Sequence, residues 1–348
     1  MARSYSILTV FAFLFLLLIW GGRQSLSQNT STQGFESYQS DVKAQENAPE
    51  KLQIKSLSPH EIENCLNKNR EIDLRELWSL LNIKQDTDFP ERCGNRYGLC
   101  KTEKIVVEES GDDVILKLTI ADASRYLHFR RIEKYPVFSE DKWKFVGHVD
   151  SLYQQYAPPE QRIINGNNKT YLVVRELWGR GTGVGLYGER WYELSEQPPK
   201  EMLSYPVEGH DVQGQAFDRV FESGVSQRLA NGSYIVEVQF SIFYGVEKES
   251  AIFSKKQKAC YVRDSEAEKF SLSKTCSNVS EEELEAVYNF DSMNEEGVLE
   301  YNFGELEKIA MYGKPEQKEW LENYLSRIGE SPKREALQKL LARKTSYR

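Results

Sequence analysis

This sequence has little of what most recognisable enzymes carry. It contains only four histidines, and it has neither an HExxH string nor a GxSxG string. Those strings mark zinc proteases and serine hydrolases, because they place two metal ligands on one helix face or a nucleophile on a strained turn. A long apolar run is also missing beyond Trp20: the best stretch, Tyr234 to Val246, contains Glu237 and Gln239. A membrane-spanning helix needs about 20 apolar residues, so we expect none there.

The first residues have the layout of a secretory signal peptide. Ile7 to Trp20 is an apolar or near-apolar run of fourteen residues, preceded by Arg3 and followed by two glycines. Ser25 and Ser27 place small side chains at positions minus three and minus one of a cut before Gln28. The run is short for a permanent anchor, which needs about 20 apolar residues. We expect cleavage and a secreted or periplasmic protein with no stable membrane span; an uncleaved anchor is the alternative.

Basic residues are scarce relative to acidic ones. Without residues 1–27, which hold two arginines and no acid, the chain has 43 basic and 53 acidic residues and a net charge of −10. An acidic surface of that size repels phosphate backbones and anionic lipids. We therefore expect no nucleic-acid partner.

Cysteine is also rare, and export determines how the five cysteines are interpreted. In an oxidising compartment, close pairs form disulfides. Cys93 and Cys100 enclose a short glycine-bearing loop, and we predict that they are bonded. Cys260 and Cys276 are separated by fifteen residues, and we predict a second disulfide there, which would stabilise the fold by about 3 kcal/mol. Cys65 lies on a helical pattern, where we expect a buried thiol. No CxxC-like spacing indicates zinc.

Helical patterns lie at the two ends of the chain. Ser58 followed by Pro59 predicts a helix start, since proline at the first helical position loses no hydrogen bond. Ser280 and Glu283 are spaced as a capping box for a later helix. Two further helix starts are predicted at Pro315 and Pro332.

Between these ends the apolar positions alternate with period two, as in strands. The strongest pattern is Ser233 to Tyr244, and the preceding Asn231 and Gly232 form the dipeptide of a tight hairpin turn. Strands are predicted at residues 104–109, 113–120, 125–133, 142–149, 170–177, 189–194, 217–228 and 233–244. They follow one another at short intervals without helices between them, which favours antiparallel pairing.

These patterns predict an α+β fold: a central antiparallel β-sheet or half-open barrel with short N-terminal helices and a C-terminal helical segment. Residues 1–27 form the signal peptide, and residues 28–55 a disordered tether that is poor in large aliphatic side chains. Residues 56–278 hold the helical lead and the β domain. Residues 279–348 form helices that either pack on the sheet or make a small helical tail.

The segment Gly183 to Gly188 reads GVGLYG, a literal GxGxxG. In dinucleotide-binding folds such glycines open a helix that holds a pyrophosphate, but here they lead into predicted strand 189–194. A kinase-type loop would also need a lysine and a catalytic Asp and Asn at defined places, and no such set is found. We favour a glycine-rich hairpin that needs positive φ or close backbone approach, and we expect no cofactor.

Arginine and aromatic residues crowd around this hairpin. They are Arg175, Trp178, Arg180, Tyr187, Arg190 and Trp191. These residue types dominate recognition hot spots, because they offer large rigid surfaces with hydrogen-bonding tips, and aromatic rings can also stack on sugars. The alternative is that alternate aromatic positions fill the core of the sheet. We expect some of these side chains inside and some exposed.

The sequence leaves three functional hypotheses. The first is a non-enzymatic exported binding or scaffold protein with an unknown protein or glycan partner outside the cytoplasm. The alternative is a secreted or periplasmic hydrolase of polysaccharide or peptidoglycan, with a carboxylate pair hidden among 53 acids. A metal-dependent enzyme around His148, His210 and Asp211 ranks third, because zinc needs three or four convergent ligands and no metal-binding spacing is found.

Overall fold

The structure is a computed structural model that describes most of the chain beyond residue 49. The described residues are 50–51, 54–67, 71–84, 89–94, 100–107, 112–121, 123–133, 141–151, 159–166, 169–181, 183–195, 198–211, 219–245, 251–264, 267–288 and 295–343. The chain divides into residues Met1–Ala48 and Pro49–Arg348, and every described residue belongs to the second unit. The predicted signal peptide and most of the predicted tether lie outside the described residues.

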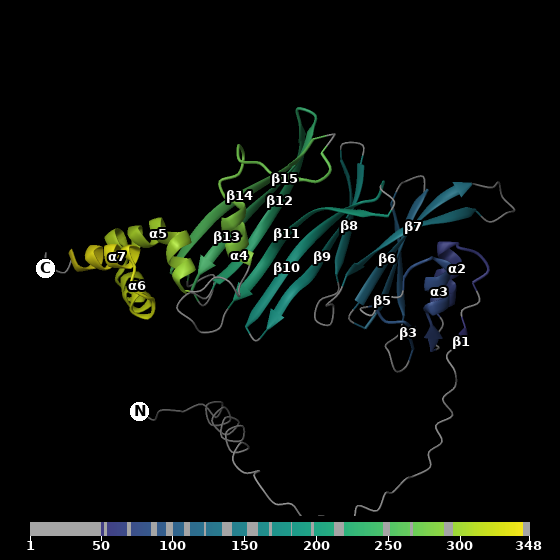
Figure 1. The fold of residues 1–348 in the computed structure, drawn as a ribbon, viewed down its shortest axis with the longest axis horizontal. Helices are drawn as coiled ribbons and strands as arrows, with labels where there is room; N and C mark the ends of the chain where they lie inside the picture. Colours follow the sequence, from purple (N-terminus) through teal and green to yellow (C-terminus); the bar gives the residue numbers. More distant parts are fainter. Residues whose placement is uncertain are drawn as a thin grey trace, which may run out of the picture. The chain divides into compact units, whose positions relative to one another are not determined.

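Antiparallel sheets and terminal helices confirm the expected α+β fold (Figure 1). Of the three sheets in the described residues, one has four strands in the order β4-β5-β6-β7, one has eight in the order β15-β14-β13-β12-β11-β10-β9-β8, and a small one is made of three two-residue strands near the N-terminus. The eight-stranded sheet is open, with β15 and β8 at its edges. The strands of the two larger sheets are β4 (Lys101–Val106), β5 (Asp113–Ile120), β6 (Ala123–Glu133), β7 (Lys142–Ser151), β8 (Glu160–Gly166), β9 (Lys169–Gly181), β10 (Val184–Glu193), β11 (Lys200–Asp211), β12 (Arg219–Ala230), β13 (Ser233–Tyr244), β14 (Phe253–Arg263) and β15 (Ser271–Leu272).

Short N-terminal elements cover one face of the four-stranded sheet. They are β1 (Glu50–Lys51), α2 (Pro59–Leu66), β2 (Ile72–Asp73), α3 (Arg75–Leu80) and β3 (Arg92–Cys93). Ile62 and Trp78 from the helices pack against Leu116 of the sheet in one core. On the opposite face, Tyr126 packs with Tyr192 of the larger sheet in a second core. Because both faces are covered, every residue of β5 except Thr119 is buried.

The eight-stranded sheet divides into two halves at β11 and β12. These strands pair only where Glu208–Asp211 meets Arg219–Glu222, whereas β12 pairs with β13 along its whole length. Within the described residues, the Lys200–Val207 part of β11 therefore has no partner strand on the side away from β10. The halves also pack face to face, because the ring of Tyr205 stacks on that of Tyr261 with centroids 5.9 Å apart.

Four C-terminal helices pack on the β12–β14 half (Figure 1). They are α4 (Glu281–Tyr288), α5 (Glu295–Tyr312), α6 (Pro315–Arg327) and α7 (Pro332–Arg343). The ring centroids of Trp320 in α6 and Phe253 lie 5.9 Å apart, and both side chains pack against the largest core. The predicted capping box of α4 is present, since Ser280 and Glu283 exchange hydrogen bonds of 2.9 and 3.2 Å. No helix in the described ranges is long and apolar enough to cross a membrane.

The strongest sequence pattern gave one of two strands whose bounds were predicted without error; the other is β5. The bounds of β13 are those predicted, and the turn before it has positive φ angles of 52° at Asn231 and 78° at Gly232. Positive φ at both central residues is what a two-residue hairpin requires. Three long strands were not predicted: β8, β11 and β14.

The two predicted disulfides have different outcomes. Cys93 and Cys100 are bonded, with Cα atoms 5.5 Å apart, and Cys65 is buried as expected. The predicted bond between Cys260 and Cys276 is not present: both are thiols in the structure. Their side chains are neighbours, and burial together with a hydrogen bond to Cys276 raises the pKa of the Cys260 thiol to about 12. Backbone hydrogen bonds already hold the turn after β15 on β14, so the thiols meet without a covalent link.

Candidate functional site

The glycine-rich string forms the turn and the start of β10, as the hairpin interpretation requires. Gly183 has a φ of +78°, which favours glycine. A Cβ atom on Gly185 would lie 2.4 Å from the His210 ring, and one on Gly188 would lie 2.1 Å from the Trp178 ring. A strand and not a helix follows these glycines, so the pyrophosphate-binding geometry of a dinucleotide fold is not formed. Because Gly185 and Gly188 have no side chain, the rings of His210 and Trp178 can lie directly against the backbone of β10.

Strand register places the predicted contact residues on two opposite faces of β9 and β10. Trp191 pairs with Val173, and both belong to the core under the C-terminal helices, which we call the inner face. Arg190 and Tyr192 alternate with it and lie on the outer face, where Tyr192 packs toward the four-stranded sheet. The prediction that these residues are partly inside and partly exposed therefore describes the hairpin correctly, at least for those whose side chains are described.

The inner face is closed around Trp191. Trp191 has no exposed surface, and its indole Nε1 donates to the Tyr205 hydroxyl at 3.2 Å. Tyr205 in turn donates to Glu189 at 2.5 Å, and both oxygens of Glu189 accept from Arg162 at 2.6 and 2.7 Å. A fully buried indole cannot touch a partner in this fold, so Trp191 leaves the set of predicted contact residues.

Glu193 is the most buried carboxylate of the inner face, with no exposed surface. It accepts hydrogen bonds from Arg263 at 2.5 Å, from the Ser195 hydroxyl at 2.5 Å and from Lys169. Burial favours the neutral acid, but these three donors outweigh it and hold the pKa of Glu193 below its usual range. The charge is thus fully compensated inside the protein.

The outer face carries the first exposed arginine and aromatic pair. The guanidinium of Arg190 lies 5.8 Å from the centre of the Trp178 ring, and its side chain is 41% exposed. Its Nε donates to the buried Glu176 at 2.9 Å, and its Nη1 lies 3.8 Å from Glu201 of β11. Burial raises the pKa of Glu176, and Ser151, Arg190 and Trp178 offset this only in part.

A second pair lies on the inner face of the same hairpin, because Tyr187 alternates with Glu189 and Trp191 along β10 and Arg175 pairs with Glu189; Tyr187 also packs against the largest core. Arg175 stands 5.7 Å from the centre of the Tyr187 ring and forms an ion pair of 2.6 Å with Glu208. The Arg175 side chain is 33% exposed, and Tyr187 is partly exposed. Arg180 lies in β9, but its side chain is outside the described part of the chain. The hairpin therefore presents four described contact residues: Arg175, Trp178, Tyr187 and Arg190.

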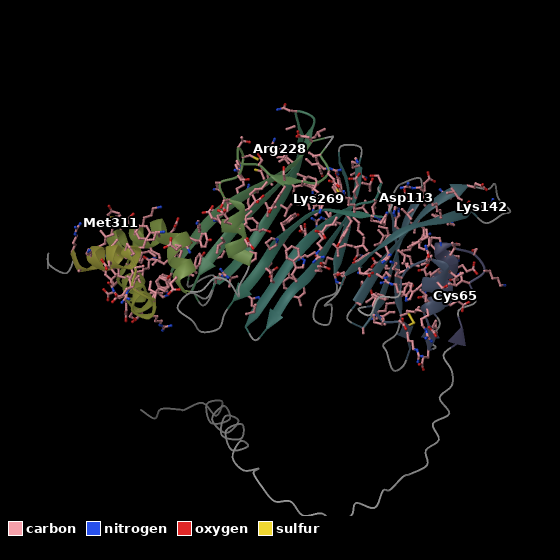
Figure 2. All side chains as sticks on the ribbon, in the orientation of Figure 1. Cys65, Asp113, Lys142, Arg228, Lys269 and Met311 are labelled. Atoms are coloured by element: carbon pink, nitrogen blue, oxygen red, sulfur yellow. A yellow bond between two sulfur atoms is a disulfide. The ribbon has the colours of Figure 1, made fainter. Side chains whose placement is uncertain are left out.

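A groove that sequence reasoning missed borders the unpaired edge of β11. Its cavity volume is about 430 Å³, within the range of ligand pockets. Apolar side chains of Met202, Leu203, Phe270, Leu272 and Leu284 line it, together with charged residues Glu201, Lys269, Glu281 and Glu285. Lys269 is labelled in Figure 2. The alternation of Leu203, Tyr205 and Val207 could have predicted the strand β11. Pro206 in this stretch could have indicated that the strand has an unpaired edge, because proline lacks the N–H that pairing needs.

The other hypotheses find less geometric support. Among the described side chains, no group of three or more His, Cys, Asp and Glu residues is arranged to hold a metal ion. His148 stands 3.9 Å from Asp150, which Arg125 already holds, and His210 covers Gly185. The side chain of Asp211 is not described. Comparison of the chain with protein-family models, curated proteins and solved structures finds no match.

Proposed function

We propose that this chain is an exported binding or scaffold protein whose contact face, as we call it, is the part of the β9–β10 hairpin that carries Trp178 and Arg190 on the outer side of the sheet and Arg175 and Tyr187 on the inner side. The observation that carries the proposal is the pairing of each arginine with an aromatic ring at the surface of one hairpin. Arginine, tyrosine and tryptophan are the residues over-represented in binding hot spots. The partner is a protein or a glycan outside the cytoplasm.

The hairpin holds its contact residues in place before a partner arrives. Gly188 allows the Trp178 ring to lie against the backbone, and Glu176 and Glu208 fix the two guanidinium groups. Side chains that are ordered beforehand lose less conformational entropy on binding, which favours affinity. The exposed ring faces and guanidinium edges remain available for stacking and hydrogen bonds.

Two features support export. The N-terminal run from Ile7 to Trp20 has the layout of a signal peptide, and the Cys93–Cys100 bond is typical of an oxidising compartment. A cut before Gln28 would release the chain that carries the contact face.

The contact face is tested by replacing its two aromatic rings while the core stays intact. Tagged full-length protein, its W178A/Y187A variant and a Y301A/Y312A control are incubated with culture medium or envelope extract of the producing cell, and on a glycan array. Tyr301 and Tyr312 are exposed elsewhere, so the control also removes two aromatic rings from the surface. We expect W178A/Y187A alone to lose at least about 90% of the captured partner, a loss of more than 1.4 kcal/mol. Equal capture by all three proteins would refute the contact face.

A hydrolase is the second candidate, favoured by one observation. Glu176 is a buried carboxyl with a raised pKa, as a general acid requires, and Glu201 is its neighbour across Arg190. If these two carboxyls act on a glycosidic bond, E176Q abolishes release of soluble sugar from dyed peptidoglycan or polysaccharide while leaving binding unchanged. Absence of release by the unaltered protein on both polymers would remove this candidate.

A further inference from the structure

The groove beside β11 has the features of a site for an extended polypeptide. The Lys200–Val207 part of β11 lacks a partner strand on one side within the described residues. An unpaired strand edge presents a row of backbone donors and acceptors, and peptides bind such edges by adding a strand. In most proteins these edges are covered or paired, which makes an open edge beside a cavity informative.

One backbone contact shows that this edge accepts donors from outside its own strand. The N–H of Phe270 donates to the carbonyl of Met202 at 3.2 Å, although Phe270 lies just before β15 and not in a strand of its own. Beyond Met202 the edge continues through Ser204, whose side chain is exposed, to Pro206. Proline has no N–H to offer, so an added strand would pair with the residues before it.

The floor of the groove is apolar, and its rim is acidic. Met202, Phe270 and Leu284 are buried and lie along the cavity. Glu201, Glu281 and Glu285 stand at the rim against one basic residue, Lys269. Glu281 and Glu285 are exposed and belong to α4, whose first turn holds three glutamates. Charges of this sign select basic partners and repel acidic ones.

We infer that the groove binds an extended peptide segment of a partner in which basic side chains alternate with apolar ones. Its backbone pairs with the open edge of β11 that lies after Met202, whose carbonyl already accepts from Phe270, and before Pro206. The period of two in a strand places the apolar side chains toward the cavity and the basic ones toward the acidic rim. This ligand site is separate from the proposed contact face, and Glu201 is the residue that lies next to both.

The test uses fluorescein-labelled peptides of about six residues, roughly 20 Å when extended. In the first peptide lysine and valine alternate, in the second glutamate and valine alternate, and the third is the first with its lysine backbone nitrogens methylated. A fourth carries the methyl groups on the valine nitrogens. Fluorescence anisotropy is measured with full-length protein. We expect the lysine peptide to bind at least about tenfold more tightly than the glutamate peptide. One of the two methylated peptides should lose binding, since only one edge of the peptide pairs with β11.

Matched variants locate the site. E281K/E285K should weaken the lysine peptide about tenfold, whereas E282K/E319K, which changes the same charge at exposed positions that do not line the groove, should leave it within about twofold. W178A/Y187A should bind the peptide normally, so the groove and the contact face can fail separately. Equal binding of all four peptides, or no difference between the two charge variants, overturns the inference. So does self-association of the full chain that E281K/E285K abolishes, because the occupant would then be a second copy.

Discussion

Each face of the β9–β10 hairpin carries a buried carboxylate, and the pKa values of the two are shifted in opposite directions. On the inner face, Glu193 has three donors and a lowered pKa. On the outer face, Ser151, Arg190 and Trp178 offset the burial of Glu176 only in part, and its pKa is raised. The same strand pair thus carries Glu193, whose charge is stabilised by its partners, and on the other side Glu176, whose burial is only partly compensated.

This difference separates structural from functional use of the same residue types. The Glu193 carboxylate is buried and already accepts three hydrogen bonds, so it offers no interaction to a binding partner. Incomplete compensation is found most often where a protein binds or reacts, because the missing interaction can come from a ligand. The hairpin sequence alone does not reveal which face is which, since both contain arginine, glutamate and aromatic residues.

Removing an aromatic ring from each face gives the largest contrast. W191A should lower the free energy of unfolding by about 4 kcal/mol, because the cavity forms in a closed core. W178A removes a ring that is only partly buried and should cost about 1 kcal/mol or less. Urea unfolding followed by circular dichroism measures both. Similar values for the two variants would mean that the faces do not differ in packing.

Removing the inner charge should be nearly as damaging. E193Q leaves the buried guanidinium of Arg263 without its carboxylate, which should cost about 3 kcal/mol at pH 7. The native pKa of Glu193 lies below the ordinary 4.5, so its contribution is present above pH 4.5 and is lost as the pH falls through the native pKa. The difference between E193Q and the unaltered protein should therefore shrink in acid. A difference that stays constant with pH would contradict the assigned ion pair.

Adding a methyl group at the glycine under the outer tryptophan tests the close approach. G188A would place a Cβ atom 2.1 Å from the Trp178 ring and should cost about 2 kcal/mol. G224A is the matched control in β12, where no atom lies within 4 Å of the added carbon. In a strand, alanine there should be neutral or should stabilise by about 0.5 kcal/mol. Calorimetry measures the melting temperatures of the two variants, and equal values would argue against the close approach of the Trp178 ring to Gly188.

Removing the outer charge should have the smallest effect, with the opposite dependence on pH. The native pKa of Glu176 lies above the ordinary 4.5, so the folded protein binds more protons than the unfolded chain between these values, and stability falls as pH rises through this window. E176Q should remove that decline and change stability at pH 7 by less than about 1 kcal/mol, since its partner Arg190 is partly exposed. Urea midpoints from pH 4 to pH 8 measure the slope. An E176Q variant that declines as steeply as the unaltered protein would show that another group titrates there.

Prediction from sequence succeeded where local chemistry decides the structure. Alternation and the Asn231–Gly232 turn determine β13, and proline at the first helical position determines the starts of α2, α6 and α7. It failed where tertiary context decides. Pro206 and Gly209 hide β11, and Lys255, Lys256 and Lys258 hide β14, because charged residues on both faces of a strand obscure the alternation of its apolar positions.

The candidate site was predicted in part for the same reason. Composition located the hairpin and its contact residues, but period two cannot tell which face of a sheet a second layer will cover. Trp191 was therefore grouped with Trp178, although one is core and the other is surface. The groove could not be predicted, because β11 lies far in the sequence from β15 and α4, and the three elements come together only in the folded protein.

The short junction between β11 and β12 also has a consequence for cooperativity. β12, β13 and β14 are consecutive strands with long backbone ladders between them, whereas among the described residues β11 shares a backbone ladder with β12 only at Glu208–Asp211. Strands that are paired along their whole length open and close together as one cooperative unit. The short ladder between β11 and β12 couples the opening of β11 only weakly to that of this unit. Native-state hydrogen exchange should therefore find two cooperative units within one sheet, and the backbone amides at the β11 edge should exchange with the solvent before those of β13.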